Sequence, residues 1–155
     1  MSQKVFLIGL PGAGKTTMGL DLAVHLGLQF VDLDQDIEKD TKQSINEIFE
    51  QKGEAYFRQL EKLNLEKIIA GLDSFVMATG GGTPCFFNNL ESMQKAGVTI
   101  FINTPIEQIE SRVKLDTSRP LMKSITLSDL LQRRKGWYNQ ADHTIQEYKE
   151  IIKLF

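Results

Sequence analysis

The sequence predicts a three-layer α/β/α fold with a five-stranded parallel sheet as its middle layer. Short apolar runs typical of buried strands alternate with amphipathic segments typical of helices along the 155 residues. Such crossover segments are what parallel neighbours in a sheet require. A glycine-rich turn joins the first apolar run directly to the first helical segment. Because no internal repeat or low-complexity linker interrupts this alternation, we expect residues 1–155 to form a single domain.

The expected strands are short apolar runs that stop at turn residues. The first contains Val5-Phe6-Leu7-Ile8, a continuous apolar run of the kind found in strands that are buried on both faces. The third stops at three successive glycines, and the last is short enough for an edge of the sheet. The five expected strands are residues 4–10, 28–33, 75–78, 98–102 and 142–145.

The expected helices carry apolar residues at the spacing of one helical face. Gly27 is placed as a C-terminal cap, Ser44 and Glu47 have the spacing of a capping box, and Pro105 suits the first residue of a helix. The long helix includes Leu63 among its apolar positions. The expected helices are residues 15–26, 34–40, a segment after Ser44, 53–72, 86–96, a segment from Pro105, 127–138 and 147–154, and residues 115–125 are expected to form an exposed loop.

Composition and charge exclude several classes of protein. The 18 basic and 20 acidic side chains give a formal net charge of −2, and no basic stripe is available for duplex nucleic acid. No segment approaches the roughly 20 apolar residues that span a bilayer, and the N-terminus lacks the cleavage site of a secretory signal. We therefore expect a cytoplasmic protein that contacts no membrane and uses its lone Cys85 for packing. His25 and His143 have no partners at metal-ligand spacing.

A phosphate-binding motif follows the first expected strand. Residues 9–16, Gly-Leu-Pro-Gly-Ala-Gly-Lys-Thr, fill every position of the P-loop pattern and lie between a strand and a helix. Its glycines let backbone amides wrap around phosphate oxygens at a helix N-terminus. Lys15 is expected to reach the β- and γ-phosphates, and Thr16 to ligate Mg²⁺. The motif predicts a P-loop NTPase fold with ATP held by Gly12, Ala13, Gly14, Lys15, Thr16 and Thr17.

Two aspartates point to chemistry beyond nucleotide binding. A P-loop alone does not separate a kinase from a GTPase, an ATPase motor or a nucleotide sensor. Asp32 and Asp34 are expected to project the same way from the carboxyl end of the second strand, where open parallel sheets bind ligands. One carboxylate can then hold the metal through water, and the other can accept the proton of an attacking hydroxyl. Their alternative role is to cap the next helix.

Three further features favour an anionic acceptor. Arg58 stands beside Phe57, so that a guanidinium lies next to an aromatic wall. The glycines at 80–82 suit a backbone that approaches a ligand closely. Arg119, in the aperiodic loop at about 115–125, is placed like a lid residue that closes over phosphates. Residues of about 34–60 are expected to form a substrate-binding helical segment.

With these residues the chain resembles the shikimate kinases over about residues 4–142. Their combination is far more specific than any single motif. The resemblance implies a monomeric kinase that moves the γ-phosphoryl group of ATP to the 3-hydroxyl of shikimate, with Mg²⁺ as cofactor. The matching elements are the P-loop at 9–16, Asp32-Leu33-Asp34, Phe57-Arg58, Gly80-Gly81-Gly82, Arg119-Pro120-Leu121, Arg134 with Tyr138, and Ala141-Asp142.

The resemblance also implies roles for individual residues. Asp34 contacts the reacting diol, while Arg58 and Arg134 grip the substrate carboxylate and Gly81 bonds it through its backbone. Arg112 flanks the adenine. In the carboxylate pair, Arg133 is the alternative to Arg134, and the choice rests on register with Tyr138. The catalytic set is Asp34, Lys15 and Arg119, and Asp32 holds the metal through water.

One segment departs from the family pattern. After His143-Thr144-Ile145 the chain runs almost directly into its last helix, where family members have a longer loop that contacts adenine. The resemblance therefore carries over the phosphoryl chemistry but not the contacts that this loop makes to the base. The rival functions are another small P-loop metabolite kinase, of the gluconate or nucleotide type, and a nucleotide-dependent regulatory module. A sugar acid with many hydroxyls or a nucleobase has no obvious need for both Arg58 and Arg134, and a module without an acceptor has no use for Asp34 and Arg58.

Overall fold

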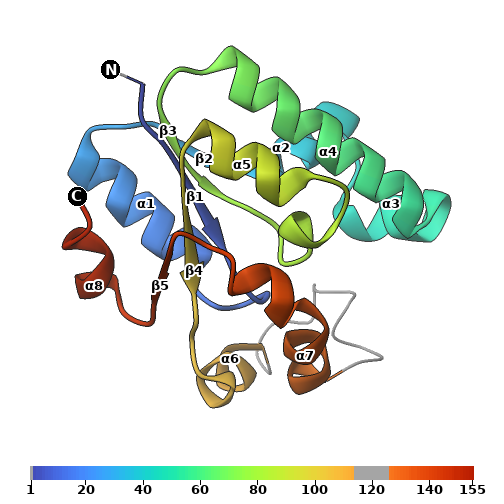
Figure 1. Cartoon of the computed structure of the whole chain (residues 1–155). Coiled ribbons are helices and arrows are strands. Elements are labelled where there is room, and N and C mark those ends of the chain that lie inside the picture. Colours follow the sequence, from blue (N-terminus) through green and yellow to red (C-terminus); the bar gives the residue numbers. More distant parts are fainter. Residues whose placement is uncertain (1, 114–125) are drawn as a thin grey trace.

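Five parallel strands form one sheet, as the sequence predicts. The computed structural model describes residues 2–113 and 126–155, so the expected lid loop with Arg119 lies outside the described residues. Neighbouring strands follow the order β2-β3-β1-β4-β5, which places the strand before the P-loop at the centre (Figure 1). The strands are β1 Lys4–Ile8, β2 Phe30–Asp32, β3 Phe75–Ala78, β4 Val98–Ile102 and β5 His143–Ile145.

The central strand is buried on both faces. Phe6, Leu7 and Ile8 have no exposed surface, because helices cover a parallel sheet from both sides. The strand ends at Ile8 and not at residue 10, since Gly9 already turns into the P-loop with a φ of +150°. At that position a β-carbon would lie 2.8 Å from the carbonyl oxygen of Ile102.

Helices cover both faces of the sheet. Helices α1 and α8 lie on one face, α4 and α5 on the other, and α6 and α7 lie near the carboxyl ends of the strands (Figure 1). None of the helices described is long and apolar enough to cross a membrane. The helices are α1 Lys15–Leu26, α2 Leu33–Thr41, α3 Ile45–Lys52, α4 Glu54–Gly71, the 3-10 turn η1 Thr83–Cys85, α5 Asn89–Ala96, α6 Ile106–Val113, α7 Leu127–Tyr138 and α8 Tyr148–Ile152.

Two predicted helix signals are confirmed. Gly27 ends α1 with a φ of +68°, and its N–H donates to the carbonyls of Ala23 and Val24. The Ser44 hydroxyl accepts from the Glu47 N–H at 3.1 Å, while the Glu47 carboxylate accepts from the Ser44 N–H at 3.3 Å. This capping box fixes where α3 begins.

Several expected boundaries were wrong. The strand expected at 28–33 is confined to Phe30–Asp32, because Leu33 already belongs to α2. The helix expected from residue 86 begins at Asn89, after the 3-10 turn. Pro105 precedes α6 instead of opening it. Leu63, expected on the apolar face of the long helix, is 59% exposed.

The order of the strands brings three functional turns to one edge. The P-loop follows β1, α2 follows β2, and the three glycines follow β3, which lies between those two strands. Because parallel strands have their carboxyl ends at the same edge, these turns face one another there. A ligand held by these turns would therefore bind at this edge of the sheet.

Candidate active site

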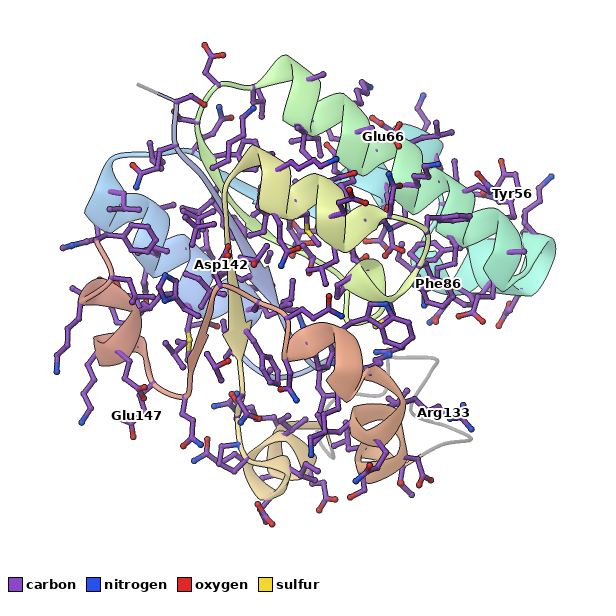
Figure 2. All side chains as sticks on the ribbon, viewed as in Figure 1. Tyr56, Glu66, Phe86, Arg133, Asp142 and Glu147 are labelled. Atoms are coloured by element: carbon purple, nitrogen blue, oxygen red, sulfur yellow. The ribbon has the colours of Figure 1, made fainter. Side chains whose placement is uncertain are left out.

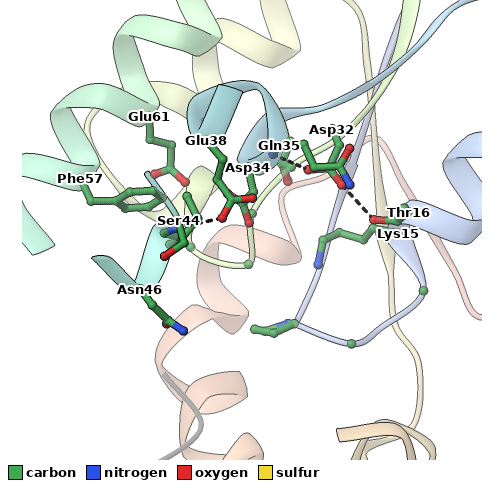
Figure 3. A pocket seen from close by; sticks show the side chains of 18 of the residues that line it. Lys15, Thr16, Asp32, Asp34, Gln35, Glu38, Ser44, Asn46, Phe57 and Glu61 are labelled. Carbon is green, nitrogen blue, oxygen red and sulfur yellow. Dashed lines mark hydrogen bonds between the residues drawn. The ribbon is translucent and has the colours of Figure 1, made fainter. Parts of the chain in front are cut away.

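A cavity of about 820 Å³ opens at this edge of the sheet. The P-loop forms one wall, and Figure 3 shows Lys15 and Thr16 there, across from Asp34, Glu38 and Ser44. The remaining walls come from α3, the start of α4, the glycine turn and α7. The predicted residues that line the cavity are Gly12, Gly14, Lys15, Thr16, Thr17, Asp32, Asp34, Arg58, Gly81, Arg112 and Arg134.

Side chains hold the shape of the P-loop by hydrogen bonds to its carbonyls. Gly14 has a φ of +103°, which side chains other than glycine rarely adopt, and it opens α1. The Lys15 ammonium donates to the carbonyls of residues 9 and 10, each at 2.8 Å. Arg112 donates to the Gly12 carbonyl at 3.1 Å. Ala13 is buried and does not line the cavity, so it could contact a nucleotide only through its backbone.

Thr16 and Asp32 form an oxygen pair beside Lys15. The Thr16 hydroxyl donates to Asp32 Oδ2 at 3.1 Å, and Asp32 Oδ1 accepts from the Gln35 N–H at 3.1 Å (Figure 3). Asp32 therefore caps α2 and faces the P-loop at once. A hydroxyl and a carboxylate suit Mg²⁺, which prefers oxygen ligands and keeps most of its waters. Across residues 2–113 and 126–155, no three His, Cys, Asp or Glu side chains gather into a metal cage.

Asp34 lies in the first turn of α2, within the helix expected at residues 34–40, and not at the end of the strand beside Asp32. Its Oδ1 atom is buried without a hydrogen-bond partner. The pKa of Asp34 is raised to about 6, first by burial and then by the nearby carboxylates of Glu61 and Asp32, while the positive charges of Lys15 and Arg58 oppose this rise. A carboxyl group with a pKa near neutrality is suited to accept a proton.

Arg58 is buried on α4, although its sequence context alone would indicate an arginine on the surface. Only 3% of it is exposed. Its guanidinium carbon lies 5.2 Å from the centre of the Phe57 ring, as expected, and 4.1 Å from that of Phe86. Salt bridges to Glu54 at 3.1 Å and to Glu61 at 3.0 Å fix its orientation.

Glu61 is the functional residue that the sequence reasoning missed. It has no exposed surface, accepts from Arg58 and from the Thr83 hydroxyl at 2.7 Å, and contributes to the raised pKa of Asp34. It therefore couples the arginine to the aspartate. The sequence did contain one indication of this contact: Glu61 follows Arg58 by three residues, which places both side chains on one face of the helix.

The glycine turn makes room for the two arginines. A β-carbon on Gly81 would lie 2.8 Å from Arg134 Nη1, and one on Gly82 would lie 2.6 Å from Arg58 Nη2. Arg134 is 7% exposed and lines the cavity, whereas the neighbouring Arg133 is exposed and points outward from α7 (Figure 2). The register expected from Tyr138 thus selects Arg134 as the arginine at the cavity.

Around the cavity, three buried polar atoms have no hydrogen-bond partner among residues 2–113 and 126–155. They are Asp34 Oδ1, Arg58 Nε and Arg134 Nη1. Buried polar atoms are normally paired, so an unsatisfied group marks a place where a ligand or water is expected. The atoms combine one acceptor with two cationic donors. The cavity can therefore hold a molecule that carries a carboxylate at one end and a hydroxyl at the other.

The remaining polar candidates lie outside this chemistry. Cys85 is half-buried against the core, and burial raises the pKa of its thiol to about 11, which keeps it unreactive. His25 and His143 are exposed. The last helix follows β5 after only two residues, as the departure noted in the sequence suggests.

Comparisons with known proteins agree with this geometry. A family model described as shikimate kinase matches residues 11–153. The chain is 42% identical over 142 residues to a shikimate kinase of Persephonella marina, covering 90% of this chain and 86% of that protein. It is 42% identical over 162 residues to one of Clostridium botulinum, covering 99% and 96%. A solved shikimate kinase from Acinetobacter baumannii in complex with shikimate superposes with a TM-score of 0.93 at 34% identity, covering 99% of this chain and 93% of that one.

Proposed function

This chain belongs to the shikimate kinase family, and we infer from this premise that it transfers the γ-phosphoryl group of ATP to the 3-hydroxyl of shikimate. The main structural support for this inference is the position of three side chains. Asp34, Arg58 and Arg134 converge on one cavity with the P-loop, each with an unsatisfied polar atom. A metabolite with both a carboxylate and a hydroxyl would satisfy all three.

We propose that two arginines anchor the acceptor. Arg58 and Arg134 would bind its carboxylate by charge-assisted hydrogen bonds, and the Gly81 backbone would add a third contact. Support comes from the neighbouring glycines, which bring the two guanidinium groups to adjacent positions of one turn. Anchoring one end of a rigid ring places the hydroxyl at the other end, which is the positioning that phosphoryl transfer needs. Residues 34–60 would form the substrate-binding segment.

Asp34 would act as the catalytic base. Its carboxylate would accept the hydrogen bond of the attacking hydroxyl and then its proton. Lys15 would stabilise the charge that develops on the phosphoryl oxygens, with the amides of Gly12, Gly14 and Thr16 around them. Arg119 on the lid loop stays a prediction in the same role.

Thr16 would hold Mg²⁺ directly, and Asp32 would hold it through water. When bound, the ion would neutralise charge on the phosphates of ATP. The support is the oxygen pair at 3.1 Å next to the P-loop lysine. Arg112, which bonds the Gly12 carbonyl, would flank the base. That the protein works as a monomer in the cytoplasm, without a nucleic-acid or membrane partner, stays a prediction of the sequence.

The test is an assay of ADP release with several acceptors. Shikimate, gluconate and nucleoside monophosphates are each supplied with ATP, in the presence of Mg²⁺ and after its removal by a chelator. We expect ADP release to depend on shikimate and on Mg²⁺. Equal turnover with gluconate or a nucleotide, or ATP hydrolysis that ignores every acceptor, would contradict the assignment.

A further inference from the structure

Tyr138 is a buried side chain that the mechanism above does not use. It ends α7, has no exposed surface, and stacks on Phe101 of β4 with ring centres 5.0 Å apart. Four residues later, Asp142 accepts from both the N–H and the hydroxyl of Thr99, at 2.9 Å and 3.1 Å. The end of α7 is thus fixed to the sheet independently of the cavity.

The Tyr138 hydroxyl reaches the glycine turn. It donates to the Gly81 carbonyl at 2.6 Å, at the short end of the range for such bonds. The Gly80 carbonyl accepts from the Thr83 N–H at 3.1 Å. In a trans peptide the carbonyl and the following N–H point in opposite directions. With both carbonyls held by the protein, the orientations of the Gly81 and Gly82 N–H groups are fixed in the turn that lines the cavity.

The same tyrosine lies one helical turn after Arg134. Residues four apart share a helical face, so the hydroxyl and the guanidinium meet beside the same turn. Arg134 Nη1 is 2.8 Å from the place that a β-carbon on Gly81 would take. Burial raises the pKa of the Tyr138 phenol, and the positive charge of Arg134 beside it lowers that pKa in part. Tyr138, Gly81 and Arg134 therefore pack as one unit.

We propose that Tyr138 is a positioning residue for the acceptor's carboxylate. Its hydroxyl fixes the turn at residues 80–82 against α7, so that the Gly81 backbone and the Arg134 guanidinium present their donors to the same anion. The inference rests on the proposed function, because it assumes an acceptor that is anchored by a carboxylate. Tyr138 would contact neither ATP nor the acceptor. It would act through Gly81 and Arg134, which would bind the acceptor.

Replacing the hydroxyl alone tests the proposal. Tyr138→Phe keeps the ring and its stacking on Phe101 but leaves the Gly81 carbonyl unpaired. We expect the KM for shikimate to rise about tenfold, the scale of one lost buried hydrogen bond, while the KM for ATP changes less than twofold. The dissociation constant of the neutral carboxamide of shikimate should barely change, since the donors are arranged for a carboxylate. A residue that served only the fold would weaken both ligands alike.

Phe101→Leu is the matched control. It removes the stacking partner of the same ring and leaves the hydroxyl in place, so we expect a lower unfolding temperature without a selective loss of shikimate. Tyr138→Phe with wild-type affinity for shikimate, with an equal loss for shikimate and its carboxamide, or with no folded protein would each overturn the proposal. If the wild-type protein itself fails to phosphorylate shikimate, the proposed function fails instead, and the two failures are distinguishable.

Discussion

Burial of Asp34 destabilises its ionised form, and that cost is what suits it to chemistry. An exposed aspartate at neutral pH is a weak base, because its carboxylate is well solvated. In this cavity, burial and two neighbouring carboxylates destabilise the ionised form, while Lys15 and Arg58 keep it accessible. The balance leaves a base whose pKa lies close to physiological pH.

We predict that Asp34→Asn lowers turnover at least about a hundredfold while leaving ATP binding nearly intact. An amide keeps the size of the side chain but cannot accept a proton. The measurement is single-turnover phosphorylation of shikimate, together with titration of ATP. Asp36→Asn, on the same helix but bound to Asn64 outside the cavity, is the control and should retain activity. Loss of less than tenfold would remove Asp34 from the proton-transfer step.

The raised pKa also predicts the pH profile. Only the ionised form of Asp34 can accept a proton, so kcat/KM for shikimate should fall as the pH drops below about 6 and level off above it. An ordinary aspartate, with a pKa of 3.8, would place this limb two units lower. The terminal phosphate of ATP also titrates near this range, so binding of ATP alone is measured at each pH. A flat profile between pH 5 and 7 would show that no group with a pKa near 6 acts as the base.

At the scale of helices and strands, the sequence predicted the features that depend on short stretches of the chain. The strand before the P-loop, the glycine cap at Gly27 and the capping box at Ser44 all follow from contacts between residues close in the chain. The P-loop motif carries its own geometry, and the edge of a parallel sheet then determines where Asp34 must lie.

The sequence did not predict what depends on how elements pack. Glu61 pairs with Arg58 on its own helix, and only the packing of α4 against the 3-10 turn also brings it to Thr83. Phe86 stacks on Arg58 because a 3-10 turn, and not a helix, occupies residues 83–85 and delays the start of α5. Leu63 belongs to the apolar pattern of α4, yet nothing in the described fold covers it fully. The contacts of Glu61 with Thr83 and of Arg58 with Phe86 join residues more than 20 positions apart, which periodicity cannot detect.

The glycine turn gives a prediction at this scale. Gly82→Ala should raise the KM for shikimate at least about tenfold, because the new β-carbon would lie 2.6 to 2.8 Å from the Arg58 guanidinium. That guanidinium cannot move aside cheaply, since two salt bridges and two rings hold it. Steady-state kinetics for both substrates provide the measurement, and the KM for ATP should stay the same.

Gly136→Ala is the matched substitution. It lies in α7, and a β-carbon there meets nothing within 4 Å. Activity should be unaffected, and the helix should gain up to about 1 kcal/mol from the better propensity of alanine. A comparable loss of shikimate affinity in both variants would show that the turn at residue 82 is not a special close approach.

At the scale of the whole molecule, the carboxyl edge of the sheet is tuned for a ligand rather than for stability. The rest of the core is a continuous apolar cluster, whereas this edge buries two carboxyl groups, two guanidinium groups and three unsatisfied polar atoms. Each unsatisfied atom costs free energy that an apolar residue would not. A bound acceptor would satisfy these atoms, so binding and folding should be strongly linked.

That linkage can be measured as a thermal shift. At about 100 times its dissociation constant, a ligand adds about 2.7 kcal/mol to the free energy of unfolding, or about 5 to 11 °C for a chain of this size. We predict a shift of this size with shikimate for the wild type and for Arg133→Ala, whose side chain is exposed. In Arg134→Ala, loss of a buried charged contact of at least about 2 kcal/mol weakens binding about thirtyfold. The same concentration is then only about three times the dissociation constant, and the shift should fall to about 2 or 3 °C. The shift given by Mg²⁺ and ATP should stay equal in all three proteins, because Arg134 lies on the acceptor's side of the cavity. An undiminished shikimate shift in Arg134→Ala would mean that another group holds the carboxylate.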